Sequence, residues 1–213
     1  MKKTVFILIS LMTLIVFSAQ AQEAGGIIEF GGQRWVVLDV QDGYALIITE
    51  NVKIIGTGQY NRSGINISWA NSTMRSYLNN EYLNIFSEEE RARIRETYVI
   101  TNNNPWYDVN GGGNIMDKVF LLSLEEVVRY FGDSGQMRIK PDNMIDRVYL
   151  SDMYDSARIA RDDTGRQAFW WLRSPGSAAR LASGIDARGT IWMYGTGVSN
   201  DSLGARPALW LKL

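Results

Sequence analysis

The chain has 213 residues, of which 22 are Lys or Arg and 23 are Asp or Glu, so its formal net charge is −1. A charge this small gives no reason to expect a nucleic acid or an anionic membrane surface as partner. The chain contains neither His nor Cys, which excludes a Ser-His-Asp triad, a cysteine nucleophile, disulfides and the common zinc and copper sites. Only carboxylates, Lys, Tyr or Ser could act as acid, base or nucleophile, and the composition therefore favours a protein that is not an enzyme.

The first 21 residues have the layout of a secretory signal peptide. Lys2 and Lys3 precede an apolar run over residues 5–17, and Ala19 and Ala21 supply the small residues of a cleavage site. The run is shorter than the roughly 20 residues that a membrane helix needs, and an uncleaved anchor is the alternative. Cleavage would remove two lysines and leave a charge of −1 − 2 = −3 on a single domain over residues 22–213. We expect an exported protein, in the periplasm, on the cell surface or outside the cell, with no stable membrane span after cleavage.

The domain begins with a predicted β-meander over residues 27–50. Its apolar runs are interrupted at Gly31-Gly32 and at Asp42-Gly43. The second dipeptide favours a two-residue hairpin turn. We therefore expect the first strands to form one side of an antiparallel sheet.

Two short helices are predicted after the meander. The first begins at Asn71 or Ser72, and its apolar residues recur at helical spacing. Those residues are Met74, Tyr77 and Leu78. The second helix begins with Ser87 and Glu90, which have the spacing of a capping box.

In the middle of the chain, DKVFLLSLEEVVRYFG at residues 117–132 predicts a short strand followed by a further helix. Ser123 and Glu126 form a second capping-box pattern, and Gly132 ends the helix. The residues expected to face the core are Leu124, Val127, Val128 and Phe131. Residues 133–167 are irregular and charged, and longer than an ordinary connection, which indicates either functional loops or an element that the pattern hides.

Strands return at the end of the chain. They are predicted over residues 169–173, 182–187, 190–194 and 205–213. Strands at both ends that enclose helices and long loops indicate an α+β fold.

Six blocks of the sequence resemble, in this order, a bacterial family of unknown function. The blocks are FGGQRWVVLD, ALIIT, SWANSTMRSYLNNEYLNIFSEEE, DKVFLLSLEEVVRYF, WWLRSPG and RPALWL, within residues 27–213. Members are similar to C-type-lectin-like domains, to modules of the formylglycine-generating-enzyme type and to variable proteins of diversity-generating retroelements. The resemblance implies a single C-type-lectin-like domain with a mixed or antiparallel sheet, short helices and long irregular loops. It does not imply the oxidative activity of formylglycine-generating enzymes, which depends on cysteines.

The WWLRSPG and RPALWL blocks frame the last part of the chain. In the fold that the resemblance implies, the two chain ends lie side by side as strands. Trp170 and Trp171 would point to opposite faces of a strand, so at least one should lie in the core. Arg173 and Arg206 are expected to be partly buried and to pair with carboxylates such as Asp117, with ligand contact as the alternative. Pro207 fits an edge position or a strand start.

The segment between these blocks mixes glycines with the amphipathic residue types that recognition surfaces favour. We predict that it forms a face that binds a protein or a glycan, and the resemblance implies that this is the region that varies in retroelement-diversified relatives. The residues predicted to line this face are Arg180, Asp186, Arg188, Trp192, Tyr194 and Asn200. The alternative is a plain surface hairpin with ARGT as its turn. No resident cofactor is expected.

Three further readings stay open. Asp162-Asp163 and Asn200-Asp201 could supply oxygen ligands to calcium, although such pairs are also common in solvated loops. A glycan or peptidoglycan hydrolase would need two carboxylates roughly 5 to 9.5 Å apart across a cleft, with Asp186 and either Asp162 or Asp163 as candidates. A purely structural envelope domain would lack an exposed aromatic patch and a concave pocket.

Overall fold

The computed structural model describes residues 23–54, 56, 58–65, 67–142 and 149–213. The predicted signal peptide, residues 1–21, lies outside these ranges. Within them, no helix has both the length and the apolar character needed to cross a bilayer.

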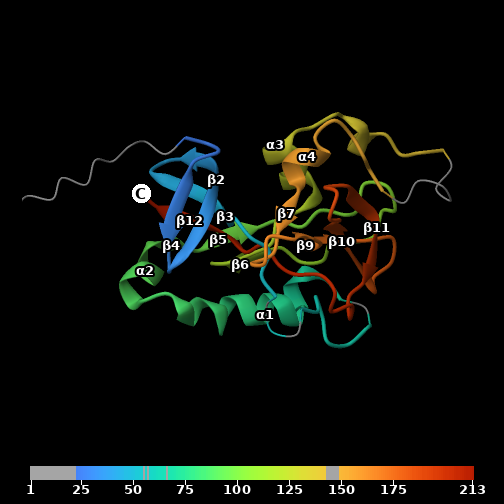
Figure 1. Cartoon of the computed structure of the whole chain (residues 1–213). Coiled ribbons are helices and arrows are strands. Elements are labelled where there is room, and N and C mark those ends of the chain that lie inside the picture. The colour runs from blue at the N-terminus through green and yellow to red at the C-terminus, as the bar shows by residue number, and fades with distance from the viewer. Residues whose placement is uncertain (1–22, 55, 57, 66, 143–148) are drawn as a thin grey trace, which may run out of the picture.

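The described part of the chain contains short helices and strands (Figure 1). The strands are β1 (Ile27–Phe30), β2 (Gln33–Gln41), β3 (Tyr44–Thr49), β4 (Ile94–Arg95), β5 (Thr97–Val99), β6 (Ile115–Asp117), β7 (Ala160–Arg161), β8 (Gln167–Ala168), β9 (Trp170–Pro175), β10 (Leu181–Ile185), β11 (Ile191–Gly197) and β12 (Ala208–Lys212). The helices are α1 (Thr73–Asn79), α2 (Glu88–Arg93), α3 (Leu124–Phe131) and α4 (Asp155–Arg158), with 3-10 turns η1 (Trp69–Asn71), η2 (Tyr82–Ile85) and η3 (Gln136–Arg138). The architecture is α+β, as predicted. Figure 1 shows α1 and α2 along one side of the molecule and α3 and α4 on the other.

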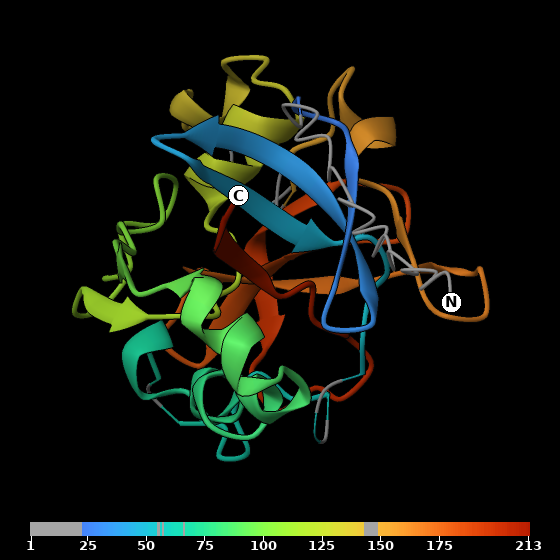
Figure 2. The same cartoon turned by 90° about the vertical axis from the view of Figure 1, so that its left-hand side faces the viewer.

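One five-stranded sheet holds both ends of the domain. Its order is β1-β2-β3-β12-β4, and β12 pairs antiparallel with β3, with Leu209 opposite Ile47 (Figure 2). The predicted meander is confirmed. Asp42 and Gly43 have φ values of 50° and 78°, as the expected two-residue hairpin turn between β2 and β3 requires.

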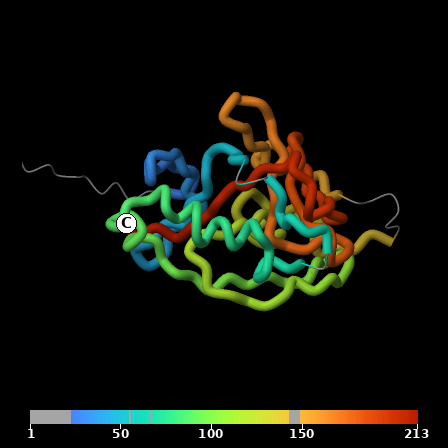
Figure 3. The backbone as a smooth tube through the Cα atoms, turned by 90° about the horizontal axis from the view of Figure 1, so that it is seen from below, coloured from blue at the N-terminus to red at the C-terminus, as the bar shows by residue number. Residues whose placement is uncertain are grey.

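A second, three-stranded antiparallel sheet has the order β11-β10-β9, and two small ribbons pair β5 with β6 and β7 with β8. After β11 the chain crosses back to the first sheet, as the red tube in Figure 3 shows. The four predicted C-terminal strands are confirmed with shifted ends. The short strand predicted at the start of DKVFLLSLEEVVRYFG is present only as an isolated bridge between Phe120 and Ala208, since β6 ends at Asp117.

Each predicted helix start is confirmed by its cap. The Ser72 hydroxyl accepts the N–H of Arg75, and both Ser87 and Ser123 form complete capping boxes. In α3, Leu124, Val127 and Val128 are buried, whereas Phe131 is half-buried. Gly132 ends α3 with a φ of 118°, and a side chain there would collide with the ring of Tyr154.

The two adjacent tryptophans of β9 both lie in the core and are fully buried. The indole N–H of Trp170 donates to the carbonyl of Arg158 at 3.3 Å, and that of Trp171 donates to the carbonyl of Gly58 at 2.9 Å. Strand β9 is therefore covered on both faces, which goes beyond the prediction that at least one tryptophan is buried. Because each indole N–H has a partner, this burial leaves neither donor unsatisfied.

Arg173 is buried and pairs with Glu126, not with Asp117 as predicted. Its guanidinium contacts both carboxylate oxygens of Glu126 and donates to the carbonyls of Leu121 at 2.6 Å and Ile100 at 2.8 Å. Asp117 accepts instead from the Trp69 indole and from Arg75, at 2.8 and 2.7 Å. Burial raises the pKa of the Asp117 carboxyl, against the lowering effect of these two donors.

Arg206 is buried without a carboxylate partner among the described residues, so the predicted ion pair is wrong for this residue. Its guanidinium donates to the carbonyl of Thr49 at 3.0 Å and lies 5.0 Å from the ring centre of Trp170. Burial lowers the pKa of Arg206 to about 10, which still leaves the group charged at neutral pH. Pro207 directly precedes β12, in agreement with its predicted place at a strand start.

Part of the irregular segment 133–167 is ordered by a buried arginine, and it contains η3, α4, β7 and the start of β8. The Arg158 side chain is fully buried and contacts Asp152 at 2.9 Å and Asp155 at 3.1 Å. It also donates to the carbonyl of Gly132 at 3.1 Å, which fastens the segment to the end of α3. The sequence pattern had therefore hidden short elements here.

We predict that Arg173→Met lowers the free energy of unfolding by about 3 kcal/mol, because it leaves the Glu126 carboxylate without its charged partner and the carbonyls of Leu121 and Ile100 without their donor. Denaturant unfolding followed by tryptophan fluorescence measures the change. Arg138→Met is the control, since Arg138 makes an ion pair with Asp133 while its side chain stays 78% exposed, and it should change stability by less than about 0.5 kcal/mol. Equal effects of the two variants would contradict a special role for Arg173.

Candidate functional site

The predicted binding segment forms the β10–β11 hairpin and the loop that follows it. Asp186 closes the hairpin turn: its carboxylate accepts the N–H groups of Arg188 at 2.8 Å and Thr190 at 2.9 Å, and its side chain is only 4% exposed. The structure thus places Asp186 inside the turn and not on a binding face, which corrects its predicted role. The ARGT sequence is the hairpin turn that the alternative reading expected.

The two predicted arginines lie at opposite ends of this hairpin. The Arg188 side chain is 79% exposed at the turn, next to a shallow hollow that also includes Tyr149 and Asp155. Arg180 immediately precedes β10 and lines a different hollow with Gly64 and Ile65. The two guanidinium groups therefore do not converge on one site.

The two predicted aromatic residues of β11 are each held by another ring. The ring centre of Trp192 lies 5.6 Å from that of Phe169, in an edge-to-face arrangement. The ring centre of Tyr194 lies 5.9 Å from that of Tyr107, also edge to face. Such pairs fix ring orientation. Tyr194 nevertheless remains 43% exposed, and Trp192 is half-buried.

Phe169, the partner of Trp192, lines a groove that we name the 52–204 groove. The groove has a volume of about 370 Å³ and combines apolar with polar side chains. It is lined by Val52, Ile54, Asp162, Arg166, Gln167, Ala168, Phe169, Ser202 and Gly204. This volume falls within the range of roughly 300 to 1,000 Å³ that is usual for small-ligand pockets.

The walls of the 52–204 groove are joined by backbone hydrogen bonds. Lys53 and Ala205 exchange two such bonds of 2.8 Å, and the N–H of Gly204 donates to the carbonyl of Phe169 at 3.0 Å. Gly204 leaves no room for a side chain, because a Cβ there would collide with Val52 and with the Lys53 carbonyl. The Lys53 ammonium group and the Asp163 carboxylate form an ion pair of 2.6 Å, which links the β7–β8 hairpin to the chain after β3. The groove is therefore formed before any ligand arrives.

Asn200 shapes the loop that borders the groove. Its side-chain oxygen accepts the N–H of Ser202 at 2.9 Å, and Ser202 lines the groove. None of the six predicted residues lines the groove itself. Trp192 packs against its lining residue Phe169, and Asn200 bonds to its lining residue Ser202.

Sequence reasoning missed the groove residues themselves. Phe169 directly precedes Trp170 and Trp171. This run of three aromatic residues was the only signal in the sequence that one of them could lie at the surface. Ile54, Gln167 and Arg166 carry no pattern that marks them, because they come together only through the pairing of distant segments.

Asp162 and Asp163, one of the two pairs predicted as calcium ligands, already have intramolecular donors. Asp162 accepts from the hydroxyl of Thr164 at 2.6 Å and from the guanidinium of Arg166 at 3.1 Å. These bonds, that of the Thr164 hydroxyl above all, lower the pKa of Asp162 to about 2. Asp163 accepts from Lys53, which lowers its pKa as well. Among the residues that the structure describes, no group of three or more acidic side chains could hold a metal ion.

The proposed carboxylate pair of a hydrolase is also not assembled at the groove. Asp162 lies in the β7–β8 hairpin and lines the groove, whereas Asp186 is enclosed in the β10–β11 turn. The geometry therefore gives no support to these two groups as acid and nucleophile across one cleft.

Residues 42–213 match the model of a protein family described as Domain of unknown function (DUF6273). The chain belongs to this family. The expected membership in a family of unknown function is confirmed, and the matched DUF6273 region contains the β10–β11 hairpin and every residue of the groove. Comparison with curated proteins gave no match, and comparison with solved structures gave none either.

We predict that Thr164→Val raises the pKa of Asp162, because it removes the hydroxyl donor that stabilises the carboxylate most. The depressed folded pKa contributes stability that is present above the unfolded value of about 3.9 and is lost as pH falls toward 2. Carboxyl chemical shifts in an NMR pH titration measure the change. Asp163 serves as the internal control, since its donor Lys53 is retained, and an unchanged Asp162 titration would contradict the assignment.

Proposed function

We propose that this DUF6273 chain is an exported, non-enzymatic binding module that recognises a protein or a glycan. The contact surface consists of β11 and the 52–204 groove. One observation carries the proposal: a preformed groove has Phe169 in its lining, and that ring is packed against Trp192 on the outer strand of the three-stranded sheet.

The aromatic pairs support recognition because they are already oriented. Trp192 and Tyr194 each have a ring partner and lose little side-chain freedom when a ligand contacts them. Aromatic residues also supply a large contact area with few rotatable bonds. A partner that covers both rings would therefore gain apolar contact at a small cost in entropy.

The groove supports a ligand that offers both apolar and polar groups. The side chains of Ile54 and Phe169 provide apolar contact, and those of Gln167 and Ser202 provide hydrogen-bonding groups. A sugar ring or a short stretch of peptide has this mixed character. A structural envelope domain has less support, because it would need neither the groove nor the exposed ring of Tyr194.

We infer further that the fold is C-type-lectin-like. In support, the first strands and the last strand share one sheet, while β9 to β11 carry the surface proposed for binding. A retroelement-diversified protein is a narrower form of this proposal, with residues 177–204 as the varied segment. A neighbouring reverse-transcriptase gene with an imperfect template repeat would support that form, and their absence would remove it.

We predict that the Trp192→Ala, Tyr194→Ala double variant weakens binding about tenfold or more, because truncating two aromatic contact residues removes interactions of hot-spot size. A glycan array and a pull-down of bacterial surface proteins identify the ligand, and each is repeated with calcium and with a chelator. The matched control is the Tyr98→Ala, Met116→Ala variant, since these residues form an exposed pair on the β5–β6 ribbon.

Unchanged binding by the folded Trp192, Tyr194 variant would contradict the proposed surface. Absence of any ligand for the natural chain would favour a structural envelope domain. Loss of binding with the chelator would support the alternative that calcium takes part in ligand binding.

A further inference from the structure

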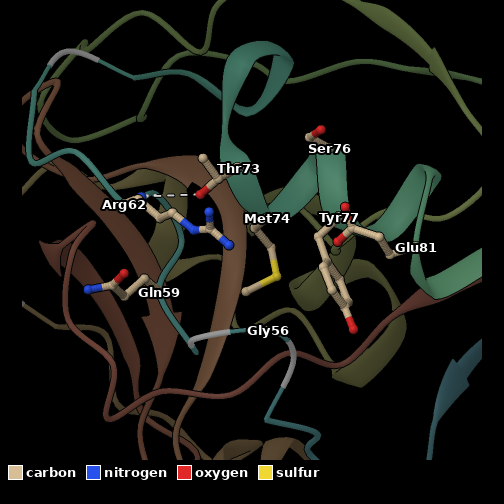
Figure 4. Close-up of a pocket in the computed structure, with 8 residues that line it drawn as sticks. All are labelled: Gly56, Gln59, Arg62, Thr73, Met74, Ser76, Tyr77 and Glu81. Atoms are coloured by element: carbon tan, nitrogen blue, oxygen red, sulfur yellow. Dashed lines mark hydrogen bonds between the residues drawn. The ribbon is translucent and has the colours of Figure 1, made fainter.

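A second hollow, separate from the 52–204 groove, lies between α1 and the loop before it (Figure 4). We name it the α1 pocket. It has a volume of about 140 Å³ and is lined by Gly56, Gln59, Arg62, Thr73, Met74, Ser76, Tyr77 and Glu81. Since water occupies about 30 Å³ per molecule in the liquid, this space suits only a small ligand.

Two opposite charges face the α1 pocket without meeting. Arg62 and Glu81 both line the hollow, and Figure 4 shows the Arg62 guanidinium near Met74 and the Glu81 carboxylate beside Tyr77. The ion pairs of the described residues include neither side chain. The pocket thus offers a cation and an anion at once, separated by more than the reach of a direct ion pair.

The loop that presents Arg62 is held firmly to the helix. The N–H of Arg62 donates to the hydroxyl of Thr73 at 3.1 Å, and the N–H of Thr73 donates to the side chain of Asn61 at 2.9 Å. Asn61 is buried, with 2% of its surface exposed. Gln59 donates to the carbonyl of Ser199 at 2.8 Å, which fixes the other end of the loop. These bonds fix the backbone that carries Arg62, whose side chain itself is exposed.

The rest of the pocket supplies an apolar wall and hydroxyl groups. The ring of Tyr77 packs on Gly56, where an added Cβ would be in ordinary contact with the ring at 3.6 Å. Met74 lies beside this ring, and Ser76 and Thr73 contribute hydroxyl oxygens (Figure 4). A ligand with charged groups at one end, for Arg62 and Glu81, and a short side chain, for the apolar wall, matches this arrangement.

We propose that the α1 pocket binds a free α-amino acid with a small side chain. The planar fork of Arg62 receives the carboxylate, as guanidinium groups do through two parallel hydrogen bonds. The carboxylate of Glu81 accepts from the ammonium group. A ligand that carries only one charge satisfies only one side of the pocket, and single exposed ion pairs are weak. This site does not depend on the surface proposed around β11.

The test is a calorimetric titration of the full chain with glycine, L-alanine and L-serine up to millimolar concentrations. Two half-ligands serve as probes: acetate has no ammonium group, and glycinamide has no carboxylate. We expect the amino acids to bind at least tenfold more tightly than either half-ligand. Arg62→Gln and Glu81→Gln should each weaken amino-acid binding tenfold or more. Glu89→Gln and Arg91→Gln, which change the same residue types on α2, should leave it unchanged.

Arg62 and Glu81 are exposed, so neither variant should alter the Tm, and a melting curve verifies that each remains folded. The proposal is overturned if no amino acid binds the natural chain, if acetate binds as tightly as glycine, or if the two variants bind like the controls. The Trp192→Ala, Tyr194→Ala variant should keep its amino-acid binding. That result separates failure of this site from failure of the surface around β11.

Discussion

The pairing of buried Arg173 with Glu126 is the interaction that fixes α3 and its neighbouring chain segments against the three-stranded sheet. Glu126 belongs to the capping box that begins α3, and the same carboxylate receives the guanidinium of a residue in β9. Arg173 also donates to the carbonyls of Leu121 and Ile100, so its side chain joins β9 to residues 121–126 and to the chain after β5. A charge buried to this extent is tolerable only with all these partners, which explains why it restricts the geometry so strongly.

Arg206 shows a different way to bury the same group. It has no carboxylate partner in the described structure and rests instead on the ring of Trp170 and on the backbone carbonyl of Thr49. Guanidinium groups are weakly hydrated and stack on aromatic faces, so this environment suits arginine better than lysine. The WWLRSPG and RPALWL blocks are thus linked in space: a tryptophan of the first covers the arginine of the second, and both lie where β9 and the chain before β12 cross.

The two sites proposed for ligands arise at the edges of this buried framework. The 52–204 groove forms where the chain after β3 meets the β7–β8 hairpin and the loop before β12. The α1 pocket forms where another part of the chain after β3 meets α1. In both cases buried residues hold the backbone from which the exposed side chains extend. The segment around Ser199 reaches both regions, since it bonds to Gln59 on one side and leads into Ser202 on the other.

The sequence by itself determined the features that depend on near neighbours. The Asp42-Gly43 turn and the caps at Ser87 and Ser123 need only residues within a few positions, so their patterns could be read directly. It also indicated α+β architecture and the burial of at least one of the two adjacent tryptophans. Only the tertiary structure decided which partners distant residues choose: Arg173 and Glu126 are 47 positions apart, and Gln59 and Ser199 are 140 apart. Asp186 was predicted to lie on a binding face because it belongs to a segment rich in residue types that recognition surfaces favour. Only the folded turn showed that its carboxylate is enclosed. Pairing across such separations follows from how the whole core packs, which no local pattern records.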